Sequence, residues 1–406
     1  MRKYWKSIAI AASIVLSIGT FYATSAKSAE HYPEFVIQPL SGDIQEVKHL
    51  VLEGMYINPS SMNYINSNLK ITVQGSSYNS RSILDQLIGN YPTVIKKFQE
   101  DYHTFMRGKD PVVSLYFEDS EFLAYANADY TIDTMGPEDF EFEIAVLNKD
   151  DGTVNSFAVE VPDGGGLDHI FVEDVQLVEN KLYLITQNMV RKNDSFNEEK
   201  HIYEIDLDTQ NLISHETLAE SAQSKENIHT YTRLVENSPT AANEQIILLK
   251  TEETVTEEIE SIRMTDFKQE IVFYDLATKE TETVNVPGLS LEENQLSLVE
   301  GSTLYFTRVE EQELIVTPYR LGENQVDREL RIQLQSAMEK GLVPFLSVKE
   351  GKLYVVSPQI NSKSNGDITV VDMQTGETLF KGQIALKTPS EEKGDFELHL
   401  HEIHVK

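Results

Sequence analysis

From residue 111 onward, hydrophobic and polar positions alternate with a period of two, and turn-forming residues separate the runs. Successive side chains of a strand point to opposite faces, so this alternation predicts β-strands. Residues 181–186 and 201–207 are two clear examples. One short helix is expected in this part of the chain, at residues 329–340. The pattern therefore predicts an all-β protein.

Five segments repeat one order of elements: a strand, a polar hairpin tip, a second strand, a turn and a third strand. They begin at residues 122, 181, 245, 303 and 352, which are 49 to 64 residues apart. Such spacing fits four-stranded propeller blades with inserted loops. We expect a β-propeller-like fold of about six or seven four-stranded blades, one or two of them from the divergent N-terminal region. Two separate all-β domains are the alternative.

The clearest repeat consists of residues 351–357 (GKLYVVS), 367–372 (DITVVD) and 375–377 (TGE). This phrase resembles the blade consensus of β-propeller repeats of the quinoprotein-like kind. The resemblance covers residues 122 to about 386 and implies architecture alone. It implies no quinone-binding or catalytic residue, and the tryptophan usual in those blades is missing, since Trp5 is the only one in the chain.

Residues 30–110 have a different pattern, with strand-like pieces followed by a helical one. Pro92 suits the first turn of a helix, and apolar residues from Val94 to Phe105 recur on one helical face. This predicts a short helical insertion near residues 92–106. We expect the last strand, residues 397–405, to pair with an early strand, which would remove a free sheet edge.

Residues 1–29 begin with basic side chains, continue as an apolar stretch from Ile8 to about Ala23 and end in small residues. That order is typical of a secretory signal peptide. An uncleaved membrane anchor is the alternative, because residues 7–26 are long enough to cross a bilayer. Either way, the remainder would be extracellular, or outward-facing and anchored to the cell membrane. The expected divisions are therefore a leader at 1–29, a divergent β part with the helix at 30–110 and propeller-like repeats at 111–406.

The charge balance excludes several partners. The chain has 34 Lys and Arg against 66 Asp and Glu, for a net charge of −32. Four of the basic residues lie in the leader, so the remainder carries −36. A surface this negative repels nucleic acid and anionic membranes, which leaves the N-terminal segment as the expected membrane contact. The absence of cysteine excludes disulfides, thiolate metal sites and cysteine nucleophiles.

Three histidines lie close together near the end of the chain: His399, His401 and His404. In a regular strand, His399 and His401 share one face while His404 points to the other. Joint chelation of zinc would therefore need a break in the strand. The spacing from His401 to His404 is also one residue too short for the helical zinc-protease motif. Exposed strand histidines are expected, and a weak metal site is the alternative.

Two further segments carry carboxylates with open alternatives. Asp163 and Asp168 flank a glycine-rich run, which we interpret as a loop between blades, with calcium binding as the alternative. Glutamates crowd residues 252–260, which we interpret as a solvated hairpin tip, with contact to a basic partner or bridging cations as the alternative. No helix follows the glycine run, so it does not form a phosphate cradle.

Asp206, Asp275 and Asp372 each precede a turn in a repeat. An aspartate there accepts hydrogen bonds from the backbone just ahead, so we interpret all three as turn-forming. Ser-x-x-Lys occurs at residues 67–70 and 390–393, without the Lys-Thr-Gly companion of the known catalytic set. The sequence thus assigns no catalytic or cofactor-binding residue and leaves cofactors and metal ligands unknown.

These observations favour an exported, non-catalytic binding or scaffold protein of the cell envelope. Its expected partner is another envelope protein or an extracellular ligand, since repeats build rigid surfaces with loops on one face. An extracellular hydrolase or lyase acting on polysaccharide or peptide is one alternative. A membrane-tethered sensor or regulator, which would keep its leader, is the other.

Overall fold

The computed structural model describes residues 17–20, 33–57, 67–78, 91–134, 136–162, 164–192, 195–220, 228–235, 242–243, 245–258, 261–334, 344–357, 359–362, 364–388 and 396–405. The chain forms two compact units. We call residues 91–294 the central unit and residues 1–90 with 295–406 the terminal unit. Among the described residues, none belongs to a helix long and apolar enough to span a bilayer.

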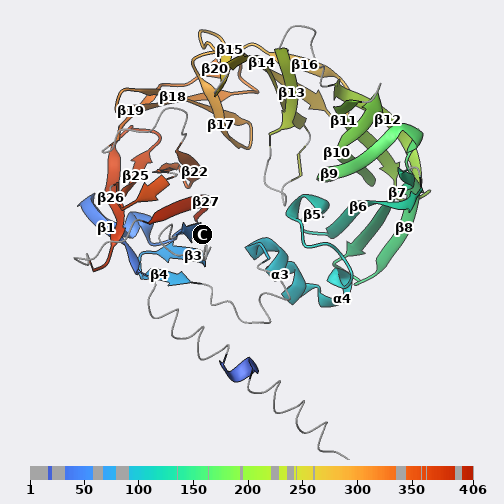
Figure 1. Cartoon of the computed structure of the whole chain (residues 1–406), viewed down its shortest axis with the longest axis horizontal. Helices are drawn as coiled ribbons and strands as arrows, with labels where there is room; N and C mark the ends of the chain where they lie inside the picture. The colour runs from blue at the N-terminus through green and yellow to red at the C-terminus, as the bar shows by residue number, and fades with distance from the viewer. Residues whose placement is uncertain are drawn as a thin grey trace, which may run out of the picture. The chain divides into compact units, whose positions relative to one another are not determined.

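The central unit contains three antiparallel four-stranded sheets (Figure 1). The strands of the first sheet are β5 (Tyr116–Glu118), β6 (Phe122–Asp133), β7 (Gly136–Asn148) and β8 (Val154–Glu160). Those of the second are β9 (Leu167–Val178), β10 (Lys181–Lys192), β11 (Ser195–Asp206) and β12 (Asn211–Glu220). Those of the third are β13 (Ile228–Leu234), β14 (Gln245–Glu258), β15 (Ser261–Asp275) and β16 (Thr281–Val284). Each strand pairs with its neighbour in sequence, which is the order of a propeller blade.

The predicted helical insertion is confirmed, in two short pieces. They are α3 (Thr93–Asp101) and α4 (His103–Met106), followed by the 3-10 turn η2 (Val113–Leu115). Ile95 and Phe98 of α3 are fully buried, and the Phe98 ring lies 5.6 Å from that of Tyr116. The apolar face read from the sequence therefore joins the hydrophobic core of the first two sheets.

The terminal unit also contains three antiparallel sheets. The first has β17 (Gln295–Glu300), β18 (Thr303–Glu310), β19 (Glu313–Arg320), β20 (Gln325–Val326) and β21 (Leu330–Gln333). The second has β22 (Phe345–Lys349), β23 (Lys352–Val356), β25 (Gly366–Asp372), β26 (Thr378–Leu386) and β1 (Phe35–Gly42), which the 3-10 turn η1 (Ile44–Val47) follows. The third has β24 (Gln359–Asn361), β27 (Glu397–Val405), β2 (Leu50–Ile57), β3 (Ser67–Thr72) and β4 (Gly75–Tyr78).

The repeat analysis located the sheets correctly. Each predicted repeat begins at the second strand of a sheet, namely β6, β10, β14, β18 and β23. A sixth sheet comes from both ends of the chain, because β27 pairs with β2 from Leu50 to Ile57. The expected pairing of the last strand with an early one is thus confirmed. The described part of the chain contains six such sheets, so the all-β propeller-like class holds, while the division at residue 110 stays a prediction.

The helix expected at residues 329–340 is wrong where the structure describes it. Leu330–Gln333 forms β21, which pairs antiparallel with β19. Leu330, Ile332 and Leu334 are buried while the residues between them are exposed. This period of two, matched to the buried face of β19, prevails over the local helical pattern.

Candidate functional site

The three recurring aspartates form turns, as predicted. In each case one carboxylate oxygen accepts hydrogen bonds from the backbone N–H and the hydroxyl of the threonine three residues ahead. For Asp206, the N–H of Thr209 donates at 2.7 Å and its hydroxyl at 2.9 Å. These hydrogen bonds lower the pKa of Asp206, and of Asp275 and Asp372 likewise. All three carboxylates are therefore engaged by their own turns.

Among the described residues, the structure does not bring together the carboxylate and serine–lysine candidates of the sequence. Asp168 forms an ion pair with Arg191 at 3.0 Å, whereas Asp163 lies outside the described residues. The glutamate-rich run at 252–260 lies on the β14–β15 hairpin, whose backbone the structure describes up to Glu258 and again from Ser261. The glutamate side chains after Glu252 lie outside the described part of the chain. Of the two Ser-x-x-Lys motifs, residues 67–70 belong to β3, and residues 390–393 lie outside the described chain.

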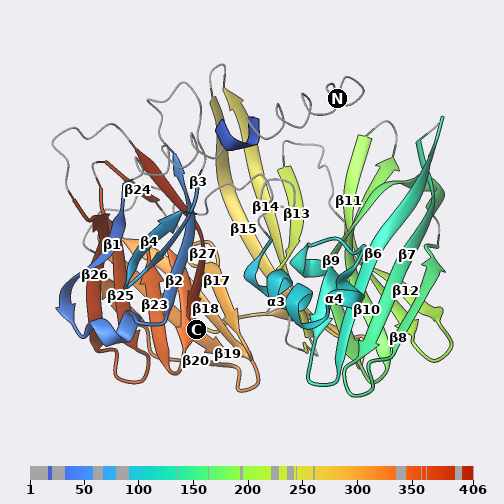
Figure 2. The same ribbon diagram turned by 90° about the horizontal axis from the view of Figure 1, so that it is seen from below.

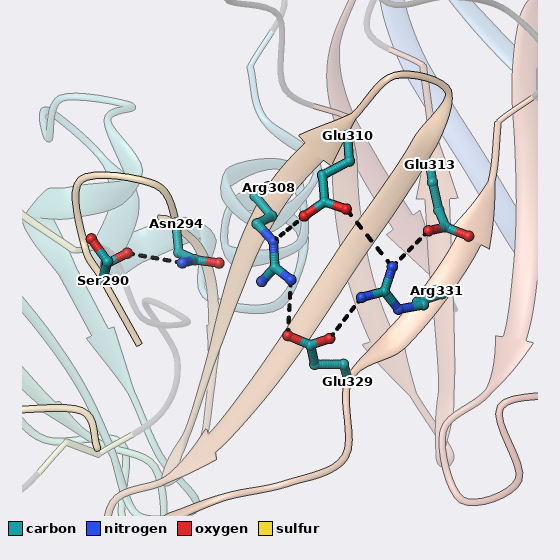
Figure 3. Close-up of polar contacts among 7 residues, drawn as sticks. All are labelled: Ser290, Asn294, Arg308, Glu310, Glu313, Glu329 and Arg331. Atoms are coloured by element: carbon teal, nitrogen blue, oxygen red, sulfur yellow. Dashed lines mark hydrogen bonds and ion pairs between the residues drawn. The ribbon is translucent and has the colours of Figure 1, made fainter. Parts of the chain in front are cut away.

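Figure 3 shows an ion-pair network on the first sheet of the terminal unit. Glu329 lies between two arginines, 3.0 Å from Arg308 and 3.3 Å from Arg331. Glu310 and Glu313 complete the network, at 2.9 Å from Arg308 and Arg331 respectively. Hydrogen bonds to Glu310 and Glu313 raise the pKa of Arg308 and Arg331. Because the guanidinium groups are already shared among carboxylates, we interpret the network as support for β19 and β21.

A line of polar side chains crosses β11 and β12, buried on β11 and exposed at its end on β12. Glu199 and His201 of β11 are both under 10% exposed, and Glu199 Oε2 lies 2.9 Å from His201 Nε2. On its other side, His201 Nδ1 lies 2.7 Å from His215 Nε2 and 3.5 Å from Thr217 Oγ1. The His215 ring stacks on that of Tyr203, with centroids 4.5 Å apart and planes inclined by 5°.

The antiparallel register creates this arrangement. Glu199, His201 and Tyr203 alternate on one face of β11, and His215 and Thr217 lie opposite Tyr203 and His201 on β12. A carboxylate, an imidazole and a hydroxyl in line are the parts of a nucleophile relay. However, His215 already occupies the His201 nitrogen that faces the hydroxyl. No spacing in the sequence points to this line, because its members come from two strands.

The opposite face of the same sheet holds buried charges that are paired. Lys200 Nζ lies 2.6 Å from both carboxylate oxygens of Glu173. Glu204 forms ion pairs with Lys181 at 2.8 Å and with Lys279 at 2.7 Å. Burial by itself would raise the pKa of Glu204, but hydrogen bonds from these lysines and from Ser214 outweigh it and lower the pKa to about 2. The pairs of Lys200 and Lys181 lie within the second sheet, whereas the pair of Glu204 with Lys279 joins it to the turn between β15 and β16 of the third sheet.

Two groups of aromatic side chains lie on the β6–β7 hairpin, on β9 and on the β10–β11 hairpin. The tips of the two hairpins are at the same end of the central unit (Figure 2). The Arg191 guanidinium lies 5.4 Å over the Phe196 ring and pairs with Asp168. The next residue, His169, has its ring 4.1 Å from that of Phe171 and 5.5 Å from that of Tyr130. We call this surface the aromatic rim; its members are Tyr130, His169, Phe171, Arg191 and Phe196.

The rim combines exposed apolar area with charge. Phe171 is 51% exposed and Phe196 is 48% exposed, although aromatic side chains of this size are usually more buried. Exposed carboxylates lie on the β6–β7 and β10–β11 hairpins, at Asp129, Asp133 and Glu198. An apolar centre with an arginine and a polar edge is the composition of a protein-binding surface. Sequence reasoning missed it, because the aromatics sit in ordinary strand alternation.

The three C-terminal histidines are arranged differently from the expectation. A one-residue bulge at His401 shifts the β2–β27 register, so that Met55, Glu53 and Val51 oppose His399, Glu402 and His404. His399 and His404 therefore share a face, which corrects the predicted orientation of His404. His399 pairs with Glu397 at 3.0 Å and His404 with Glu402 at 3.0 Å. Glu53, Glu402 and His404 form a group whose ligand atoms lie within 4.8 Å of one another.

No protein-family model matches the chain, and no curated protein matches its sequence. Among solved structures, TolB from Acinetobacter baumannii matches at 11% identity and a TM-score of 0.31, over 86% of this chain and 65% of that one. The polysaccharide lyase Uly1 matches at 11% sequence identity and a TM-score of 0.34, over 70% of this chain and 57% of that one. A variant of Synechocystis apocarotenoid oxygenase matches at 8% sequence identity and a TM-score of 0.41, over 88% of this chain and 94% of that one.

This chain spans less than two thirds of the TolB and Uly1 chains. At these identities the likenesses assign no activity, substrate or partner to it.

Proposed function

We propose that this chain is an exported, non-catalytic binding protein of the cell envelope, which holds a protein partner on the aromatic rim. The observation that carries the proposal is the exposure of Phe171 and Phe196 on one sheet, in β9 and β11, together with the contact of Arg191 in β10 with Phe196. Aromatic and arginine side chains dominate the binding energy of protein interfaces. Export is supported by the signal-like order of residues 1–29. The blade phrase at 351–377 supports repeats of the quinoprotein-like kind.

The chemistry of the partner follows from the rim and its surroundings. The exposed aromatic rings would bind an apolar patch of the partner, and the carboxylates on the β6–β7 and β10–β11 hairpins would bind basic side chains at the edge of that patch. A surface of net negative charge does not favour nucleic acid or an anionic lipid surface. The expected partner is therefore an envelope protein with an apolar patch bordered by lysine or arginine.

Paired substitutions test this function. Phe171→Ala with Phe196→Ala should abolish recovery of the partner after crosslinking in intact producing cells. The matched control is Val154→Ala with Ile213→Ala, which removes similarly exposed apolar side chains from β8 and β12 of the same unit. Equal recovery with both double variants would refute binding at the rim. Thermal melting of both variants checks that the fold is retained.

A second candidate, peptide hydrolysis, is favoured by the line of Glu199, His201 and Thr217. In this reading His201 would take the proton of the Thr217 hydroxyl, and Glu199 would stabilise the imidazolium. The 2.7 Å contact of His215 with His201 opposes it, because the required nitrogen is engaged. Peptidase activity on a peptide library that His201→Ala and Thr217→Val both abolish would establish this function. The absence of cleavage by the unaltered chain would exclude it.

A further inference from the structure

On β2 and β27, two carboxylates face each other directly. Glu53 and Glu402 form a cross-strand pair, and His404 lies two residues from Glu402 on the same face. Like charges directly opposite on adjacent strands repel each other. Glu53 is 25% exposed and Glu402 is 46% exposed, so an ion from solvent can reach both. Something positive between them would stabilise the pairing of the two strands.

The His404 imidazole contributes a nitrogen without a hydrogen bond. Its Nε2 atom is buried and makes no hydrogen bond among the described residues. It lies 3.0 Å from Glu402 Oε1, but this contact lacks the geometry of a hydrogen bond. Buried polar nitrogens almost always have a partner. A metal ion between Nε2 and the carboxylates would supply one.

We propose that Glu53, Glu402 and His404 bind a divalent transition-metal ion of the zinc class. One imidazole nitrogen and two carboxylate oxygens suit Zn²⁺, whereas Ca²⁺ and Mg²⁺ prefer oxygen ligands alone. Two atoms bound to one zinc ion at about 2.0–2.2 Å lie at most about 4.4 Å apart. The three ligand atoms here already lie within 4.8 Å of one another, so small side-chain adjustments bring them to one ion. Three protein ligands leave one position for water or for a fourth ligand.

Lys70 competes with the ion for one ligand. Its Nζ atom lies 3.4 Å from Glu53 Oε1, and its side chain is 36% exposed. The ammonium group can therefore swing into solvent when a metal ion arrives. Removing this competitor should tighten binding, whereas removing a ligand should weaken it. That pair of opposite effects separates a metal site from an ordinary ion-pair cluster.

The site would connect the beginning of the chain to its end. Glu53 belongs to β2, and Glu402 and His404 belong to the last strand, β27. A bound ion would therefore stabilise the closure of the third sheet of the terminal unit. This inference concerns a surface separate from the aromatic rim and does not depend on the proposed function.

Isothermal titration of the full chain with Zn²⁺, without a histidine tag and after chelator treatment, tests the site. We expect one ion per chain, with micromolar affinity and a raised melting temperature. Glu402→Gln, which keeps the shape of the side chain, and His404→Ala should each weaken binding at least tenfold. Lys70→Met should strengthen it severalfold.

His399→Ala is the matched control, because His399 pairs with Glu397 on the same strand and face. Binding that survives in this variant and fails in Glu402→Gln supports the site. No zinc binding by the unaltered chain, or equal losses in His399→Ala and Glu402→Gln, would overturn it.

Discussion

His215 Nε2 lies 2.7 Å from His201 Nδ1, so one of these imidazoles must donate a hydrogen bond to the other. When Glu199 is ionised, it accepts the proton on His201 Nε2, which lies 2.9 Å away. In the neutral His201 ring, Nδ1 is then the acceptor, and His215 Nε2 is the donor. The carboxylate thus fixes the tautomer of both rings through one chain of hydrogen bonds.

His215→Phe tests this chain of hydrogen bonds. The substitution keeps the stacking on Tyr203 but removes the donor to His201 Nδ1. Among the described residues, His201 Nδ1 then keeps only the 3.5 Å contact with the Thr217 hydroxyl. We expect the free energy of unfolding to fall by about 1–2 kcal/mol in urea denaturation. Ile213→Ala, an exposed change on the same strand, should alter it by less than about 0.5 kcal/mol. Equal effects would show that the hydrogen bond contributes nothing.

The buried Glu204 predicts a pH dependence of stability. Its pKa is about 2 in the folded protein, against 4.5 for an unperturbed glutamate, so the folded state favours the ionised form. The resulting stabilisation is present above pH 4.5 and is lost as the pH falls towards 2. Allowing for screening of the partly exposed Lys181 and Lys279, it is on the order of 2 kcal/mol.

Urea denaturation of the unaltered chain and of Glu204→Gln between pH 2 and 7 measures this contribution. The neutral variant should be less stable at pH 7, and the difference should shrink as the pH approaches 2. A constant difference across this range would contradict the assigned pKa. Glu160→Gln, at an exposed glutamate of the same unit, serves as the control.

Gly54 tests the closure of the third sheet of the terminal unit. A Cβ atom at this position would lie 2.7 Å from the backbone oxygen of His399, on the paired strand β27. Gly54→Ala should therefore displace β27 and lower the free energy of unfolding by about 2 kcal/mol or more. Gly322→Ala in the same unit meets no atom within 4 Å and should have little effect. Similar melting temperatures for both variants would contradict the β2–β27 register.

The sequence was sufficient to predict elements that depend on local alternation. Strand pairs such as β10–β11 and β23–β25 follow from period-two runs bounded by turn residues, and Asp206 and Asp372 mark those turns. Features that depend on the register between paired strands could not be predicted from the sequence. A single inserted residue at His401 reverses the face of His404, and only the pairing of β2 with β27 reveals it.

The candidate sites illustrate the same limit. Glu199 and His215 meet across a strand pair, and no spacing in the sequence connects them. The period-two pattern places Phe171 and Phe196 on one face of their strands, but it does not decide whether that face is buried or exposed. Their exposure depends on which face of the sheet is covered by its neighbour, and this is a tertiary property.

Site-specific photo-crosslinking in intact producing cells tests the central claim, that the aromatic rim binds a protein partner, most directly. A photoreactive phenylalanine analogue at position 196 should give one reproducible crosslinked protein, and the same analogue at position 213 should give none. Loss of the product when Phe171→Ala and Arg191→Ala are added would place the contact at the rim. Identical products from positions 196 and 213, or no product from position 196, would contradict the account.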